Sequence, residues 1–311
     1  MKILLSVISI LCVLSSTLVA AEEASCQEQN IKLQVLGSGG PELDDQRASS
    51  SYLIWRDDKA VVLVDAGAGS AFNFERSTAR IEDLQAILLT HLHVDHSVDL
   101  PSYIKASYFT GRDKDLPVFG PGANALMPAT SAFVSRLMGS QGAYQYLKDY
   151  VNKSEENDFH LQTHDVVVEG SEIYVSQLSQ DIRISAIDVH HGPVAAIAWR
   201  VDMENCSISF SGDMNNRYQN LSVLAKGSDI LVMHNAIPES AGGVAAQLHM
   251  KPSQIGEIAQ QSQVDHVVLS HFMKRTLGRE SQTLSTIRES YTGQLNFADD
   301  LAVFSVGMSS Q

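Results

Sequence analysis

The chain has 311 residues, of which 44% are hydrophobic, and it carries a formal net charge of −14 at pH 7. A chain of this length can bury a large core, either as one large domain or as two small ones. The strong negative charge repels polyanions, which argues against an extended nucleic-acid-binding surface.

The first 21 residues have the pattern of a secretory signal peptide. Lys2 precedes a mostly apolar run over residues 3–18, and small residues then lead to a cleavage point after Ala21. The run is short for a membrane span, so a membrane anchor is the weaker alternative, and no later segment is apolar enough to cross a bilayer. We therefore expect residues 22–311 to form a single domain, periplasmic or secreted, without membrane contact.

Two cysteines follow the predicted cleavage point, Cys26 and Cys206. In an exported protein they could pair and join the N-terminal strand to the strand that begins near Ser207. Two independent free thiols are the alternative, and the sequence does not decide between them. Neither cysteine has the spacing of a metal ligand.

Apolar runs predict a series of strands. The first, residues 31–36, ends at a glycine-rich turn over residues 37–41, where the backbone can approach a neighbour closely; the turn lacks the Lys-Ser/Thr ending of a phosphate loop. Residues 51–55 and 61–64 form a pair across a turn. Asp65 follows and is expected either to hold a neighbouring loop or to bond its own backbone. Further strands are expected at residues 86–89, 116–119, 166–168, 173–175, 182–187, 196–201, 207–210, 230–233 and 267–270.

Three segments have helical patterns. Residues 98–109 are expected to form a helix with Pro101 in its first turn. Residues 123–160 carry apolar side chains at roughly helical spacing, and we expect this segment to cap or flank the functional site. A third helix is expected to begin at Lys251-Pro252.

Histidines and aspartates gather directly after the predicted strands. Residues 90–96 read Thr-His-Leu-His-Val-Asp-His. His91 and His93 could face one point while Asp95 and His96 face a second, because one tetrahedral ion rarely takes four ligands from so short a loop. A polar loop rich in histidine by chance is the alternative interpretation.

Later strands end in the same way, and this regularity predicts that their polar side chains meet at one edge of a sheet. Three other histidines lie outside the pattern and are expected to be structural or on the surface: His160, His164 and His266. The groups that follow the later strands are His191, Asp213, His234 and His271.

In this order the motifs resemble the metallo-β-lactamase fold superfamily. The resemblance rests on His-Leu-His-Val-Asp-His at 91–96, His191, Ser-Gly-Asp at 211–213 and His271. Three further motifs are similar to its ribonuclease Z and arylsulfatase-like branch: Leu-Gly-Ser-Gly-Gly-Pro at 36–41, Val-Asp-Ala-Gly at 64–67 and Gly-Pro-Gly at 120–122. The resemblance implies an α/β (α+β) fold, an αββα four-layer sandwich with two mixed sheets face to face, helices outside and metals at one sheet edge.

The resemblance also implies ligands for two metal ions. His190 competes with His191 for one of these roles, and His191 is preferred because the family places its ligand directly before Gly-Pro. Imidazole and carboxylate ligands suit two Zn²⁺, with Mn²⁺ or Fe as an option at the second site. The implied ligands are His91, His93 and His191 for the first ion, Asp95, His96 and His271 for the second, and Asp213 bridging both.

Catalytic roles follow from the same resemblance. Asp95 would orient or deprotonate the nucleophile, a hydroxide shared by the two ions. His249 would stabilise the developing charge or protonate the leaving group; a capping or surface residue is the alternative for it. His234 occupies the histidine position of the branch's His-Glu-Ala-Thr segment and is the third catalytic candidate. Asn235 replaces the glutamate there, which leaves a proton relay through His234 without its acidic partner.

These features predict an exported dinuclear zinc hydrolase that acts on a phosphodiester or related ester of a small molecule, with a homodimer left open. An arylsulfatase, a lactonase or a β-lactam hydrolase on the same metals is an alternative, as is a zinc-binding module without hydrolytic activity. A ribonuclease Z-like endonuclease is disfavoured by the export signal and the acidic charge. It is also disfavoured because only ten residues separate Arg200 from Ser211, where ribonuclease Z has an arm that grips transfer RNA.

Overall fold

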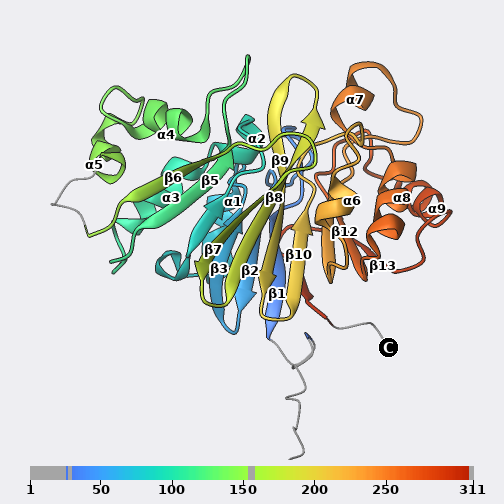
Figure 1. Ribbon diagram of the computed structural model, residues 1–311, viewed down its shortest axis with the longest axis horizontal. Helices are drawn as coiled ribbons and strands as arrows, with labels where there is room; N and C mark the ends of the chain where they lie inside the picture. Colours follow the sequence, from blue (N-terminus) through green and yellow to red (C-terminus); the bar gives the residue numbers. More distant parts are fainter. Residues whose placement is uncertain (1–25, 27–29, 153–157, 308–311) are drawn as a thin grey trace, which may run out of the picture.

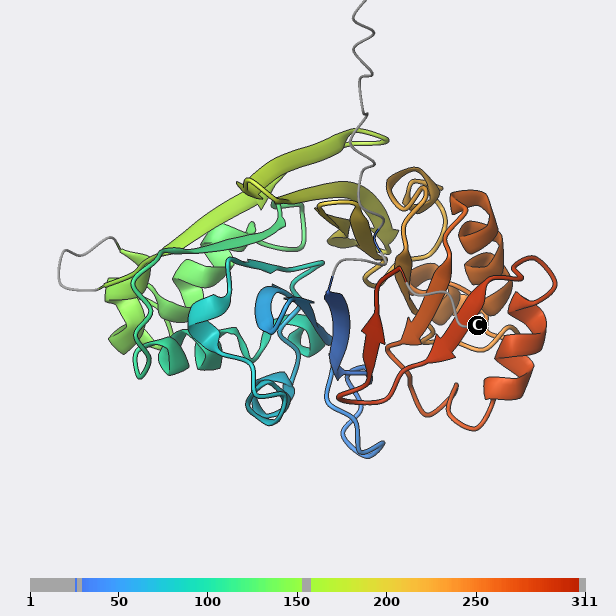
Figure 2. The same cartoon turned by 90° about the horizontal axis from the view of Figure 1, so that it is seen from below.

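Two seven-stranded β-sheets pack face to face at the centre of the molecule (Figure 1). The computed structural model describes residues 26, 30–152 and 158–307, so the predicted signal peptide, residues 1–21, lies outside the described residues. Helices cover the outer faces of both sheets, and the view from below shows the resulting αββα layers (Figure 2). This arrangement confirms the predicted fold class. Among the described residues, no helix is long and apolar enough to cross a membrane.

The first sheet has the strand order β14-β1-β2-β3-β4-β5-β6. β1, β2 and β3 pair antiparallel, whereas β3 to β6 run parallel. The short strand β4 lies in this parallel half and is buried on both faces, which explains its unbroken run of apolar residues. The strands are β1 (Ile31–Gly37), β2 (Ser51–Arg56), β3 (Lys59–Val64), β4 (Ala86–Leu88), β5 (Leu116–Pro121), β6 (Leu161–Val166) and β14 (Val303–Ser305).

The second sheet has the order β13-β12-β11-β10-β9-β8-β7. β7 to β10 pair antiparallel, and β10 to β13 run parallel. β9 is antiparallel to both β8 and β10, so β8 and β10 run in the same direction. The C-terminal ends of β8, β10, β11 and β12 therefore lie at the same edge of the sheet. The strands are β7 (Ile173–Ser179), β8 (Ile182–His191), β9 (Val194–Met203), β10 (Cys206–Phe210), β11 (Ile230–His234), β12 (His266–Ser270) and β13 (Gln294–Phe297).

Three apolar clusters fill the spaces between the four layers. On β8, Ile184 and Ala186 face the cluster between the sheets, while Ile187 and Val189 face the cluster under the helices. This division follows from the two-residue period of a strand. A third cluster lies between the first sheet and its helices. The helices are α1 (Ser70–Arg76), α2 (Val94–Ser97), α3 (Leu100–Ser107), α4 (Thr130–Met138), α5 (Lys148–Val151), α6 (Leu221–Leu224), α7 (Gly243–Leu248), α8 (Pro252–Ser262) and α9 (Glu280–Ile287).

The segment 123–160 differs from its prediction. Instead of one helical stretch it contains α4, a 3₁₀ turn at Gln145–Leu147 and the single turn of α5, while residues 153–157 lie outside the described part. Gly139 ends α4 with an extended backbone, so the apolar spacing beyond it is not continuous helix. α4 packs on β5 and β6 at the outer face of the first sheet. The segment therefore covers the sheet, and only its first residues approach the polar strand ends.

Other elements were misplaced or not predicted. The strand expected at residues 166–168 lies at Leu161–Val166, where exposed polar residues hide the alternation. Its position is set by parallel pairing with β5, in which Leu116 lies opposite Leu161. α1, α9, β13 and β14 were not predicted, and the two strands are short and partly exposed.

A disulfide joins Cys26 to Cys206, 180 residues apart in the sequence. Cys206 begins β10, and both cysteines are buried in the cluster between the sheets. The structure thus decides the choice that the sequence left open. The bond joins Cys26, which precedes β1 of the first sheet, to β10 of the second sheet.

Candidate metal centre

The loop after β4 is held by backbone and indole hydrogen bonds from the facing sheet. The indole nitrogen of Trp199 donates to the carbonyl of Leu89 at 2.9 Å, and the backbone nitrogen of Ile197 donates to the carbonyl of Thr90 at 2.9 Å. The chain then turns into α2, with His93 as the residue before the helix. These contacts fix where the three histidines of the loop begin.

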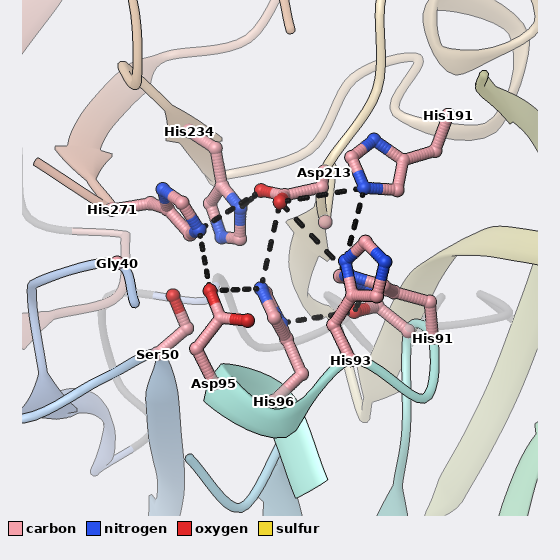
Figure 3. Close-up of polar contacts among 12 residues, drawn as sticks. Gly40, Ser50, His91, His93, Asp95, His96, His191, Asp213, His234 and His271 are labelled. Carbon is pink, nitrogen blue, oxygen red and sulfur yellow. Dashed lines mark hydrogen bonds and ion pairs between the residues drawn. The ribbon is translucent and has the colours of Figure 1, made fainter. Parts of the chain in front are cut away.

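The first cluster gathers four side chains from both sheets. The ring nitrogens of His91 (Nε2) and His93 (Nδ1) are 3.1 Å apart, and His191 Nε2 lies 3.4 Å from the same His93 nitrogen. Asp213 Oδ2 lies 3.7 Å from His191 Nε2. One ligand atom of each of these four residues lies within 4.8 Å of the others. Figure 3 shows the four side chains turned toward one another.

The second cluster lies on the other side of Asp213. His96, His234 and His271 join Asp213 within the same 4.8 Å limit. Asp95 is adjacent, with Oδ2 3.3 Å from His271 Nε2 and 3.5 Å from His96 Nε2. Asp213 Oδ1 lies 3.2 Å from His271 Nε2. The Asp213 carboxylate therefore stands between two groups of imidazoles (Figure 3).

Neighbouring groups orient the rings from outside. Asp65 accepts hydrogen bonds from the backbone and hydroxyl of Thr90 at 2.7 and 2.8 Å, and its Oδ2 is 2.8 Å from His96 Nδ1. His191 Nδ1 donates to the carbonyl of Leu248 at 2.9 Å. The other nitrogen of each ring is thereby turned inward. Of the two interpretations of Asp65, the structure shows the one in which it holds the histidine loop.

The backbone around the site is unusual at two polar residues. Asp65 and His271 have φ angles of 57° and 55°, in the left-handed region that residues other than glycine adopt at a cost. The predicted glycine-rich turn lies directly against His271. A Cβ at Gly40 would be 2.8 Å from His271 Cε1, so glycine is needed for this close approach.

Burial and charge divide the imidazoles into two groups. Burial lowers the pKa of His91, and neighbouring histidines lower it further; burial also lowers the pKa of His93 and His191. For His96 and His271 burial acts in the same direction, but the nearby carboxylates outweigh it and raise the pKa. Bound cations would replace the protons that these carboxylates attract.

The hydrogen bonding of His96 supports metal binding without reference to the family resemblance. The buried Nε2 of His96 has no hydrogen-bond partner in the described part of the chain, although it faces the carboxylates of Asp95 and Asp213 at 3.5 and 3.7 Å. A buried ring nitrogen normally has a hydrogen-bond partner, so one without a partner suggests that a cation binds there. The surrounding imidazole nitrogens and carboxylate oxygens are the ligands that a transition metal prefers. The two clusters suit a binuclear metal site that shares Asp213.

The remaining histidines take different places. His249 directly follows the last residue of α7. Its Nδ1 is 3.8 Å from Asp213 Oδ1, and its ring centroid is 5.5 Å from that of His191. His190 faces away from the clusters and contacts Tyr218 edge to face, so His191 is the one of the pair that joins the ligands. Those expected to be structural lie elsewhere: His160 by Asp115, His164 stacked on Phe119 and His266 bonded to Asn296.

Sequence reasoning missed Tyr52 and Ser270, which lie behind His234. The phenol oxygen of Tyr52 is 2.9 Å from His234 Nε2 and 3.0 Å from Ser270 Oγ. The only signal in the sequence was a polar hydroxyl on Tyr52 within the buried part of β2.

Comparison with known proteins agrees with this geometry. Residues 61–272 match the family described as Beta-lactamase superfamily domain. A curated ribonuclease Z of Mycobacterium sp. (strain KMS) is 26% identical over 283 residues, which cover 87% of this chain and 94% of the relative.

Two solved structures share the fold. The metallo-beta-lactamase fold protein YhfI from Bacillus subtilis has a TM-score of 0.69 at 19% identity, covering 89% of this chain and 99% of that one. The short form of human tRNase Z (ELAC1) has a TM-score of 0.66 at 16% identity, with coverages of 89% and 100%. With its buried histidine and aspartate centre and a family match over two thirds of its length, the chain belongs to the metallo-β-lactamase superfamily of metal-dependent hydrolases.

Proposed function

We propose that the protein hydrolyses phosphodiester bonds at a centre of two zinc ions. The observation that carries this proposal is the position of the Asp213 carboxylate between two imidazole clusters at the common edge of the two sheets. When bound, the two cations would supply a hydroxide near neutral pH and polarise the phosphoryl oxygen. His91, His93 and His191 would hold one cation and Asp95, His96 and His271 the other, with Asp213 shared by both.

Two side chains would handle protons. Burial alone would raise the pKa of Asp95, but the charges of His96 and His271 lower it to about 2, so the group is ionised and can orient the attacking water by accepting its hydrogen bond. Burial lowers the pKa of His249 to about 3, so the free ring is neutral. A bound phosphate would raise that pKa by its negative charge and let His249 donate a proton to the leaving oxygen.

The named relatives favour an RNA phosphodiester more strongly than the motifs and charge of the chain do. The relatives named ribonuclease Z align over nearly their whole length, as the Mycobacterium sp. (strain KMS) protein does with 94% of its chain. We therefore propose a ribonuclease Z-like cleavage of RNA as the leading activity.

A small phosphodiester is the second candidate. β9 ends at Met203 and β10 begins at Cys206, so this chain has a turn of two residues where, by the family resemblance, ribonuclease Z has its arm that grips transfer RNA. The net charge of −14 also weakens long-range attraction to RNA.

Metal analysis combined with a substrate panel tests the proposal. We expect two equivalents of zinc per chain, loss of turnover with a chelator and recovery with zinc. The panel contains a precursor transfer RNA with a 3′ trailer, bis(p-nitrophenyl) phosphate, p-nitrophenyl sulfate, a lactone and a chromogenic cephalosporin. Faster turnover of the sulfate, lactone or cephalosporin than of either phosphodiester, or full activity without metal, would contradict it.

Variants locate the activity in the described site. His93→Ala should lose both metal and turnover, whereas His249→Ala should keep the metal and lower kcat by about 10²- to 10⁴-fold. His164→Ala is the matched control, because that ring stacks on Phe119 and belongs to neither cluster. Equal activity of the His249 variant and the control would exclude the proton-donor role.

We also propose that the protein is exported. The disulfide between Cys26 and Cys206 supports this, because structural disulfides persist in oxidising compartments and are rare in the cytosol. The apolar run at residues 3–18 supports it from the sequence.

A further inference from the structure

A line of four buried polar side chains runs from the centre into the space between the sheets. Asp213 Oδ1 is 2.8 Å from His234 Nδ1, His234 Nε2 is 2.9 Å from the Tyr52 hydroxyl, and that hydroxyl is 3.0 Å from Ser270 Oγ. All four side chains are buried. Tyr52 comes from β2 of the first sheet, whereas the other three come from the strand ends of the second sheet.

The chemistry of the end members sets the proton positions along this line. A carboxylate only accepts hydrogen bonds, so the contact between Asp213 and His234 requires the proton on Nδ1. The Tyr52 hydroxyl donates its one proton to Ser270 Oγ, so the phenol oxygen is tied to the end of β12 on one side and contacts His234 Nε2 on the other.

Loss of the phenol oxygen would release the far side of the His234 ring. Nε2 of His234 would become a buried nitrogen without a partner, which costs about 1–3 kcal/mol. The ring would no longer be held in its present place behind Asp213. Its hydrogen bond to Oδ1 would weaken, and the carboxylate would be free to rotate away from one of the two clusters.

We propose that Tyr52 is a positioning residue of the metal centre: its hydroxyl, itself held by Ser270, keeps the His234 ring in place, and that ring aims the Asp213 carboxylate at both clusters. Tyr52 touches neither substrate nor cation and acts through His234. The inference rests on the proposed function only in requiring that Asp213 be shared by two ions.

Tyr52→Phe tests the proposal with little risk to folding, because the phenylalanine keeps the ring that packs against Phe210 at 5.5 Å. Zinc titration of the full chain should show the dissociation constants of the centre raised about 10- to 100-fold, with kcat lowered by a similar factor and KM unchanged. Tyr103→Phe is the matched control: Tyr103 is equally buried, and its hydroxyl donates to Ser70 at 3.1 Å, outside the centre. Unchanged zinc affinity in the Tyr52 variant would overturn the proposal.

Nitrogen NMR of the histidine rings gives a readout independent of catalysis. Wild-type protein should show a hydrogen-bonded Nε2 signal of His234 that is the same with and without zinc, and Tyr52→Phe should shift that signal because Nε2 has lost its partner. His234 also belongs to the same group of possible ligands as His96 and His271, so the opposing assignment is that its Nδ1 binds a cation. An Nδ1 that loses its proton when zinc is added would establish that assignment and exclude ours. If the protein fails to cleave phosphodiesters, the proposed function falls, while the titration and NMR results still decide the role of Tyr52.

Discussion

Gly40 shows how tightly single residues constrain the centre. The glycine lies against the His271 ring, whose own backbone is already in the left-handed region with φ of 55°. A methyl group at Gly40 would lie 2.8 Å from Cε1 and 3.2 Å from Nδ1 of that ring. Neither partner has room to yield without moving a predicted ligand of the second ion.

We therefore predict that Gly40→Ala weakens the second metal site more than the first. Zinc titration should show one dissociation constant raised by about tenfold or more, since displaced ligands and their supports typically change metal affinity by 10- to 100-fold. Gly111→Ala serves as the control, because a Cβ there meets nothing within 4 Å. Two unchanged zinc sites in Gly40→Ala would show that the ring of His271 does not need its present position.

At the scale of elements, the centre depends on how β9 holds the end of β4. β4 has only three residues, yet the loop that follows it carries three histidines and Asp95. The Trp199 indole reaches across the core to the carbonyl of Leu89, where this loop begins. A buried hydrogen bond of this kind contributes about 1 kcal/mol, and the indole also fills core volume.

We predict that Trp199→Phe lowers the free energy of unfolding by about 2 kcal/mol, from the lost hydrogen bond and the smaller ring, and weakens zinc binding. The matched control is Trp55→Phe, the only other tryptophan, which bonds Gln34 from the partly exposed end of β2. Urea denaturation and zinc titration measure the two effects. Loss of stability without any change in zinc affinity would mean that β9 supports the core and not the loop.

At the scale of the whole molecule, the disulfide closes a loop of 180 residues around both sheets. Cross-linking so long a loop removes much entropy from the unfolded chain, worth about 5 kcal/mol in the chain-entropy account. The bond links residue 26 to β10, the strand that leads directly to Asp213. We therefore expect reduction of this bond to lower the stability of the fold around the centre.

We predict that reduction of the wild-type protein lowers its thermal unfolding midpoint, with a loss of about 2–5 kcal/mol. Cys26→Ser/Cys206→Ser should show the same lowered midpoint with and without reductant, which separates the effect of this bond from other effects of the reductant. Thiol labelling of protein taken from whole cells measures the bond where the protein works. Free thiols at both positions in such protein would contradict the proposed export.

The sequence by itself determined the strand ends that carry the chemistry. Residues 91–96 follow the apolar strand β4, and His191, Asp213 and His271 each follow or end an apolar strand, so local periodicity was enough to place them. Strands that end at one edge bring together the groups of each sheet, and the face-to-face packing of the two sheets then joins both sets. The four-layer fold was predicted from the resemblance of these motifs to the metallo-β-lactamase superfamily.

Only the tertiary structure decided the contacts that have no local signature. Tyr52 and His234 are 182 residues apart, and their hydrogen bond exists only because the two sheets pack face to face. The pairing of Cys26 with Cys206 has the same origin. The segment 123–160 was misassigned because glycines interrupt its helical spacing, and β6 takes its position from pairing with β5. Periodicity reports the environment of a residue along its own element, whereas these features depend on which distant element lies opposite.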